Sequence, residues 1–139
     1  MPNLEIMWTK VDEAPALALV RANVDAWDKV RDTGGLDAIV ANASGCGTML
    51  KDYGFLLRSD PAYGEKAART AALSRDVSEV VAELGLHGSS AVPPLRVAYH
   101  SACSMQHGQK ISEPPRALLQ AAGFDVVEIP EGHLCCGSA

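Results

Sequence analysis

Two short apolar runs decide how this chain folds: LRVAY at residues 95–99 and FDVVEI at residues 124–129. Between them lies PPRALLQAAG at residues 114–123, where prolines at the start and a glycine at the end are typical of a helix. Parallel strands need a crossover of a dozen or more residues, which is usually helical. The two runs therefore predict a parallel pair of strands joined by a helix, with residues 100–110 as a loop or short helix.

The same alternation continues toward the N-terminus. We expect helices at 12–31, 48–57 and 62–84, the last with a kink near Ser74, and a strand at 36–41 that leads into a loop of small residues at 42–47. Helices alternating with strands are typical of an α/β fold. The sequence thus predicts one compact domain, in which a parallel β-sheet of at least three strands is flanked by helices as Rossmann-like βαβ units.

Apolar side chains spaced three or four residues apart mark the helix faces that we expect to pack in the core. In the helix at 12–31, where Asp12 is the expected N-cap, they are Leu17, Val20, Val24, Trp27 and Val30. In the helix at 62–84, which Gly85 is expected to end, they are Val77, Val80, Val81 and Leu84.

Composition excludes several classes of function. Twelve Lys and Arg against 17 Asp and Glu give a net charge of −5, which argues against a nucleic-acid partner. No run approaches the roughly 20 apolar residues of a membrane span, and no cationic start followed by an apolar run suggests a secretory signal. We therefore expect a cytoplasmic protein with reduced cysteines, which in that compartment serve metals or catalysis more often than disulfides.

All four cysteines follow a predicted strand within about one helical turn: Cys46, Cys103 and the adjacent pair Cys135 and Cys136. The carboxyl ends of parallel strands meet at one edge of a sheet, where α/β proteins bind ligands. Neighbouring strands lie about 4.8 Å apart, so we expect sulfurs of Cys103 and of the pair within about 8 Å of each other. Such thiolates select zinc or iron-sulfur clusters over hard cations.

These cysteines lie in motifs that carry a family resemblance. VAYHSAC at 97–103, PRALL at 115–119 and CCGSA at 135–139 resemble the second cysteine-rich CCG repeat of the glycolate oxidase iron-sulfur subunit family. That repeat is shared with the cysteine-rich subunit of heterodisulfide reductase and with lactate-utilisation proteins. Further upstream, ANVDAW at 22–27 and AIVANASGCGTMLKDYG at 38–54 resemble the end of the first repeat.

The resemblance divides the chain into three parts. Residues 1–17 are an N-terminal extension, residues 18–87 the end of one repeat, and residues 95–139 the start of a second that stops before its closing cysteines. In the family pattern a cysteine three residues before Cys46 would stand where this sequence has Ala43. We therefore expect a C-terminal fragment in which neither metal site is complete.

The resemblance also implies a function. Cys103, Cys135 and Cys136 would be ligands of one 4Fe-4S cluster and Cys46 a ligand of another, with no catalytic residue in this chain. The parent protein would be an oxidoreductase subunit that relays electrons from FAD-containing glycolate oxidase subunits toward quinone, peripheral to the inner face of the plasma membrane. The fragment alone would be inactive, because the sequence has no nucleotide-binding fingerprint to hold a flavin.

Two other interpretations stay open. Cys103, Cys135 and Cys136 could bind zinc together with His100 or His133, since zinc accepts three thiolates and one imidazole, in a structural or interaction module without electron transfer. A metal-free thiol oxidoreductase using Cys135 or Cys136 is opposed by the lack of a Cys-x-x-Cys motif. Missing ligands could also come from a second copy in a homo-oligomer.

Overall fold

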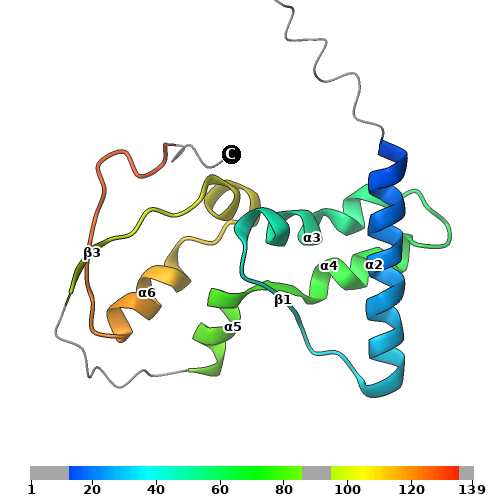
Figure 1. Ribbon diagram of the computed structural model, residues 1–139, viewed down its shortest axis with the longest axis horizontal. Helices are drawn as coiled ribbons and strands as arrows, with labels where there is room; N and C mark the ends of the chain where they lie inside the picture. The colour runs from blue at the N-terminus through cyan, green and yellow to red at the C-terminus, as the bar shows by residue number, and fades with distance from the viewer. Residues whose placement is uncertain (1–12, 86–94, 135–139) are drawn as a thin grey trace, which may run out of the picture.

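The computed structural model describes residues 13–85 and 95–134 (Figure 1). The expectations for Asp12 and for Cys135 and Cys136 concern residues outside these ranges. The elements in chain order are α2 (Glu13–Gly34), β1 (Ile39–Ala41), α3 (Ser44–Leu56), α4 (Gly64–Leu73), β2 (Ser74–Asp76), α5 (Val77–Leu84), β3 (Arg96–Ala98), the π-helical turn η1 (Ser104–Gln109), α6 (Glu113–Ala121) and β4 (Asp125–Val127). A mixed α/β fold is thus confirmed.

The strands form two separate parallel pairs. β3 pairs with β4, with Arg96 opposite Asp125 and Ala98 opposite Val127, as the runs at 95–99 and 124–129 predict. β1 pairs with β2, with Ile39 opposite Ser74. The expected single sheet of three strands is therefore wrong for the described residues, because β1 has a different partner.

That partner, β2, lies where the sequence predicts one continuous helix at 62–84. α4 ends at Ser74, whose hydroxyl donates to the carbonyl of Thr70 at 2.8 Å and whose backbone is extended. Asp76 then caps α5: its carboxylate accepts from the Ser78 N–H at 2.8 Å, and the Glu79 carboxylate accepts from the Asp76 N–H at 2.8 Å. This reciprocal capping box is a helix-start signal that reading the apolar stripe alone misses.

The small-residue segment at 42–47 is also more helical than expected. α3 begins at Ser44, so Cys46 lies in the first turn of a helix and not in a loop. The break after α3 falls between the expected helices at 48–57 and 62–84, where the Asp60 carboxylate accepts from the N–H groups of Ala62 and Tyr63 at 3.0 and 3.2 Å.

The apolar core lies between α2, α3 and α4. Its buried members are Val20, Val24, Tyr53, Leu57 and Ala67, with Leu17 and Trp27 packed against them. The expected apolar stripes are wrong at three positions: Val30, Val77 and Leu84 are exposed. The packed side of α2 continues through the buried Asp28 and the half-buried Arg31, so Val30 lies off this side and is left in solvent. Val77 and Leu84 belong to α5, a separate short helix after β2. The direction in which its side chains point is therefore not fixed by the apolar stripe of α4.

We call residues 13–85 the first unit and residues 95–134 the second unit. They meet where α3 contacts η1 and where α5 contacts α6. Among the described helices, none has the length and apolar character needed to cross a membrane.

Candidate metal centre

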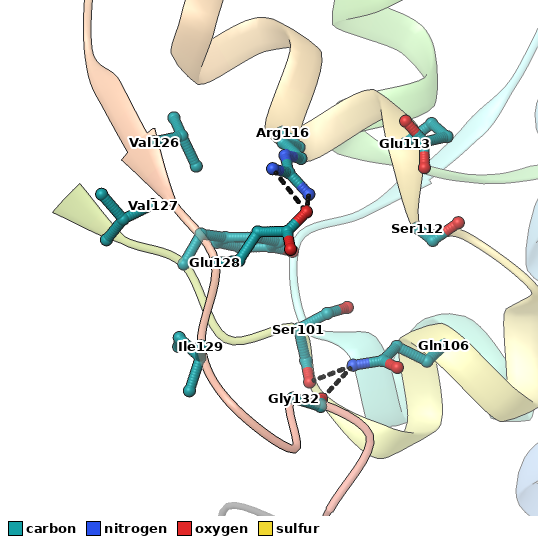
Figure 2. Close-up of a pocket in the computed structure, with 11 residues that line it drawn as sticks. Ser101, Gln106, Ser112, Glu113, Arg116, Val126, Val127, Glu128, Ile129 and Gly132 are labelled. Atoms are coloured by element: carbon teal, nitrogen blue, oxygen red, sulfur yellow. Dashed lines mark hydrogen bonds and ion pairs between the residues drawn. The ribbon is translucent and has the colours of Figure 1, made fainter.

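The candidate site lies at the carboxyl edge of β3 and β4. Two side chains connect the loop after β3 to the loop after β4. Gln106 Nε2 donates to the carbonyl oxygens of Ser101 and Gly132, each at 3.0 Å (Figure 2). His100 Nε2 lies 3.0 Å from the carbonyl oxygen of Leu134. The two loops that lead to the candidate cysteines are therefore held together.

Cys103 is half-buried in the first of these loops, directly before η1. Cys135 and Cys136 lie outside the described residues, so their expected approach to Cys103 stays a prediction. Leu134 is the last described residue before them. The contact of its carbonyl with His100 shows that the described part of the loop after β4 reaches the Cys103 loop.

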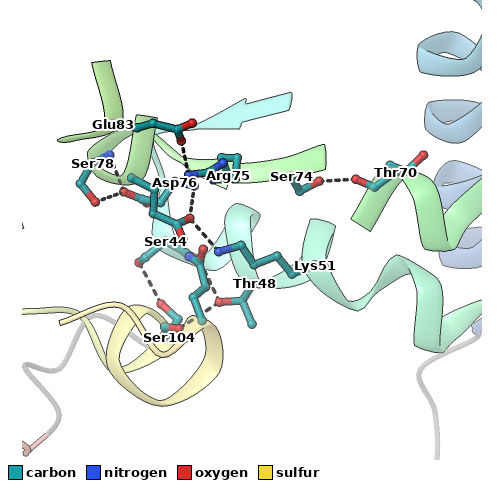
Figure 3. Close-up of polar contacts among 12 residues, drawn as sticks. Ser44, Thr48, Lys51, Thr70, Ser74, Arg75, Asp76, Ser78, Glu83 and Ser104 are labelled. Carbon is teal, nitrogen blue, oxygen red and sulfur yellow. Dashed lines mark hydrogen bonds and ion pairs between the residues drawn. The ribbon is translucent and has the colours of Figure 1, made fainter. Parts of the chain in front are cut away.

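Cys46 lies on α3, whose N-terminal turn packs against η1 through polar contacts (Figure 3). The Ser104 hydroxyl donates to the Ser44 hydroxyl at 2.8 Å, and the Thr48 hydroxyl donates to the Ser104 carbonyl at 3.1 Å. Cys46 itself is exposed. The structure thus brings together the helix that carries Cys46 and the π-helical turn that directly follows Cys103, although these cysteines are expected to serve different clusters.

Two glycines allow α3 and η1 to approach so closely. A Cβ atom at Gly47 would lie 2.7 Å from Gln109 Nε2, and a Cβ atom at Gly108 would lie 2.8 Å from Thr48 Cγ2. Gln109 Nε2 in turn donates to the Ser44 carbonyl at 2.9 Å. The glycines beside Cys46 are therefore not equivalent, because a Cβ atom at Gly45 would meet nothing within 4 Å.

A cleft of about 220 Å³ opens beside the tied loops. Arg116 reaches toward it from α6 and binds Glu128 Oε1 through both terminal nitrogens at 3.2 Å (Figure 2). The buried Ser101 hydroxyl has no hydrogen-bond partner among the described residues. Sequence reasoning does not single out Gln106, since no spacing pattern marks a polar side chain whose partners are distant backbone carbonyls. Arg116 lies in the PRALL motif at 115–119, but nothing in the sequence marks Glu128 as its partner.

The carboxyl edge of the first sheet is acidic rather than thiol-rich. Glu79 Oε2 binds Lys51 Nζ at 2.8 Å. Burial pushes the pKa of Glu79 upward, but the hydrogen bonds from Lys51 and from the Asp76 N–H outweigh it, so the pKa lies below its usual value. Asp76 is buried, and its Oδ2 has no hydrogen-bond partner among the described residues. The ion pair and the helix cap at this edge stabilise the first unit. Among the described residues, Cys46 is the only cysteine near it.

The described residues do not by themselves complete a metal site. Within 13–85 and 95–134, no three His, Cys, Asp or Glu side chains gather closely enough to hold an ion. Cys103 and His100 contribute donors at the edge of the second sheet, while His133 is exposed in the loop after β4. Any cluster or zinc ion at this edge therefore requires donors from outside the described residues, and Cys135 and Cys136 remain the predicted ones.

Known proteins match this chain over most of its length. The model of the cysteine-rich CCG domain family matches residues 7–51 and 97–139. The chain is 37% identical over 123 residues to the glycolate oxidase iron-sulfur subunit of Escherichia coli (strain K12), covering 88% of this chain and 30% of that protein. It is 33% identical over 124 residues to the probable glycolate oxidase iron-sulfur subunit of Bacillus subtilis (strain 168), covering 87% and 27%.

A third relative is lactate utilization protein A of Geobacillus thermodenitrificans (strain NG80-2), 35% identical over 104 residues, with 73% of this chain and 43% of that protein covered. No solved structure matches the chain. The chain thus spans less than half the length of each of these three relatives.

Proposed function

This chain belongs to the family of cysteine-rich CCG domains, and we propose that it is part of an iron-sulfur electron-transfer subunit of an oxidoreductase. The observation that carries this proposal is the pair of tied loops at the carboxyl edge of β3 and β4, one of which contains Cys103. The other ends at Leu134, directly before Cys135 and Cys136. Cysteine thiolates are the usual ligands of iron-sulfur clusters.

Cys103, Cys135 and Cys136 would hold one cluster, and Cys46 would be a ligand of another. The cluster supplies single-electron transfer. Further ligands would come from segments that the longer relatives contain outside the matched region. In such a longer subunit, the two parallel pairs of strands would each belong to a larger Rossmann-like sheet.

We propose that the partner is an FAD-containing subunit that oxidises glycolate, and that electrons continue to quinone at the cytoplasmic face of the membrane. Oxidation of a hydroxy acid needs a hydride acceptor such as a flavin, which an iron-sulfur cluster is not. Two of the relatives are named as iron-sulfur subunits of glycolate oxidase, which supports this choice of substrate. The chain alone is then expected to have no glycolate-oxidising activity.

One contact favours a zinc site as the second candidate. Metal-binding histidines usually donate the N–H of their other ring nitrogen to a carbonyl or carboxylate. His100 Nε2 lies 3.0 Å from the Leu134 carbonyl, which leaves Nδ1 as its remaining donor atom. His100 with Cys103, Cys135 and Cys136 would complete a tetrahedral zinc site.

Anaerobic purification followed by iron, sulfide and zinc determination and an absorption spectrum separates the two candidates. Bound iron and sulfide with visible absorption, lost in Cys103→Ser but kept in His100→Ala, would support the cluster. Colourless protein with zinc that is lost in His100→Ala would support the zinc site. The exposed His107→Ala is the matched histidine control. Because further ligands are expected from outside this chain, the same measurement is made on the full-length subunit, and a full-length subunit that binds neither metal at these cysteines would contradict both candidates.

Electron transfer itself is tested in a full-length subunit assembled with its partners. The change Cys135→Ser should leave flavin reduction by glycolate intact and reduce turnover of a quinone analogue. Equal loss of both steps would assign these cysteines to folding or assembly. Normal rates for both steps would remove them from function.

A further inference from the structure

We propose that Gln106 is a positioning residue: it holds the loop that contains Cys103 and the loop that leads to Cys135 at a fixed distance from each other. That this distance serves to bring the cysteine ligands to one metal centre rests on the proposed function. The spacing itself is a property of the protein without metal, so it can be tested separately.

The two contacts of Gln106 use the full donor capacity of its amide. A side-chain amide has two N–H donors on one nitrogen. Nε2 donates to the Ser101 carbonyl and to the Gly132 carbonyl, each at 3.0 Å (Figure 2). Ser101 lies two residues before Cys103, and Gly132 lies three residues before Cys135. One side chain therefore joins the backbone segments that lead to Cys103 and to Cys135.

The backbone of Gln106 is anchored on the Cys103 side. Its N–H donates to the carbonyl of Ala102 at 3.0 Å, and the N–H of Met105 donates to the same carbonyl at 3.0 Å. Gln106 also lies in η1, a π-helical turn that starts directly after Cys103. Single π-turns occur frequently at functional sites. Gln106 is thus a fixed part of one loop that reaches across to the other.

In the second unit, apolar packing of the strands and of α6 does not hold the two loops together. Neither β3 nor β4 contains a buried residue, and neither does α6. Loops at the edge of such a sheet are therefore positioned by hydrogen bonds. Besides Gln106, His100 also joins these loops within the described residues, through its contact with the Leu134 carbonyl. Ligand positions must be held to about 0.5 Å to form a metal site, which makes the loss of one of these two contacts consequential.

The experiment measures whether Cys103 and Cys135 can be bridged in the metal-free chain. The background carries Cys46→Ser and Cys136→Ser, so that only two thiols remain. The reduced full chain is treated with dibromobimane, whose two bromides are displaced in turn by two nearby thiolates to give a fluorescent bridge. The test variant is Gln106→Met, which keeps the length of the side chain without a donor. The matched control is Gln120→Met at an exposed position of α6.

We expect efficient bridging in the background and in Gln120→Met, and about tenfold less in Gln106→Met, because two hydrogen bonds are lost. Monobromobimane, which labels single thiols, should react equally with all three proteins. The thermal unfolding midpoint of Gln106→Met should stay close to that of Gln120→Met.

Three outcomes would overturn the proposal. The first is equal bridging in Gln106→Met and the control, and the second is the absence of bridging in the background. The third is a parallel fall of bridging and of the unfolding midpoint in Gln106→Met, which would assign Gln106 to general stability. Reduced bridging in Gln106→Met, combined with no iron or zinc bound at these cysteines in the full-length subunit, would support the positioning role and remove the proposed function.

Discussion

The two units share a plan and differ in what holds them together. Each has a parallel pair of strands whose crossover is helical. In the first unit, α2, α3 and α4 enclose a cluster that includes Val24 and Leu57, which are 0% and 2% exposed. In the second unit, the buried residues among those described are Ser101, Gln109 and Ile111, two of which are polar.

This difference shows that one supersecondary plan can be stabilised in two ways. Apolar burial contributes about 25 cal/mol per Å² of buried surface, so the first unit has a large source of stability that the second lacks. The second unit depends for its stability on its contacts with α3 and α5, while hydrogen bonds position its loops. We therefore expect substitutions to have unequal effects in the two units.

The largest expected effect is in the core of the first unit. Leu57→Ala removes a side chain that is 2% exposed, and such truncations lower the free energy of unfolding by about 2–5 kcal/mol. Urea unfolding followed by circular dichroism measures the loss. Leu56→Ala is the matched control, because its side chain is 38% exposed. Val126→Ala in half-buried β4 should cost about 1 kcal/mol. A cost at Val126 equal to that at Leu57 would break the comparison.

A smaller effect is expected where the two units meet. In Gly47→Ala the new Cβ atom would lie 2.7 Å from Gln109 Nε2, and overpacking of this kind costs about 1–3 kcal/mol of unfolding free energy. Gly45→Ala adds the same methyl group where nothing lies within 4 Å. Because alanine favours helix by up to about 1 kcal/mol over glycine, that control should be neutral or stabilising. Equal destabilisation by both changes would mean that close approach to η1 is not what Gly47 provides.

Loss of a helix-capping side chain should also have different effects on stability in the two units. Asp76 accepts the Ser78 N–H at the start of α5, whereas the Ser112 side chain makes no capping hydrogen bond at the start of α6. Asp76→Ala should lower the unfolding free energy by about 0.5–2 kcal/mol. Ser112→Ala should change it by less than about 0.5 kcal/mol. Thermal unfolding of the two variants side by side measures the contrast, and a larger loss for Ser112→Ala would reverse it.

The smallest effect concerns the acid stability of the first unit. The pKa of folded Glu79 lies below its usual 4.5. Its contribution to stability is therefore complete above pH 4.5 and declines as the pH falls through the folded value. In Lys51→Met this dependence should weaken, by at most about 1 kcal/mol for a partly exposed ion pair.

Urea unfolding at a series of pH values between neutral and about 3 measures this dependence. The control is Lys29→Met, an exposed lysine without an ion pair among the residues that the structure describes. An acid dependence that is the same in Lys51→Met and in Lys29→Met would show that Lys51 does not lower the pKa of Glu79.

Local sequence signals predict individual elements well and their pairing poorly. The strands at 95–99 and 124–129 are predictable because prolines and a glycine bound the helix between them. β2 is not, because three residues between two helices carry no alternation of apolar and polar side chains. Its signal is the pair Asp76 and Glu79, three residues apart, whose capping contacts start α5 and so release Ser74–Asp76 to pair with β1.

For the candidate site, the sequence alone determined which residues can bind a soft metal and that they follow predicted strands, because residue type and distance along the chain are local properties. Only the tertiary structure decided that Gln106 joins the loops around Ser101 and Gly132 and that α3 packs against η1 through Ser44 and Ser104. The physical reason is that the Gln106–Gly132 and Ser44–Ser104 contacts join residues 26 and 60 positions apart along the chain, through a backbone carbonyl in the first and small hydroxyl side chains in the second. Such partners are common in every sequence, so they become specific only when the fold brings them together.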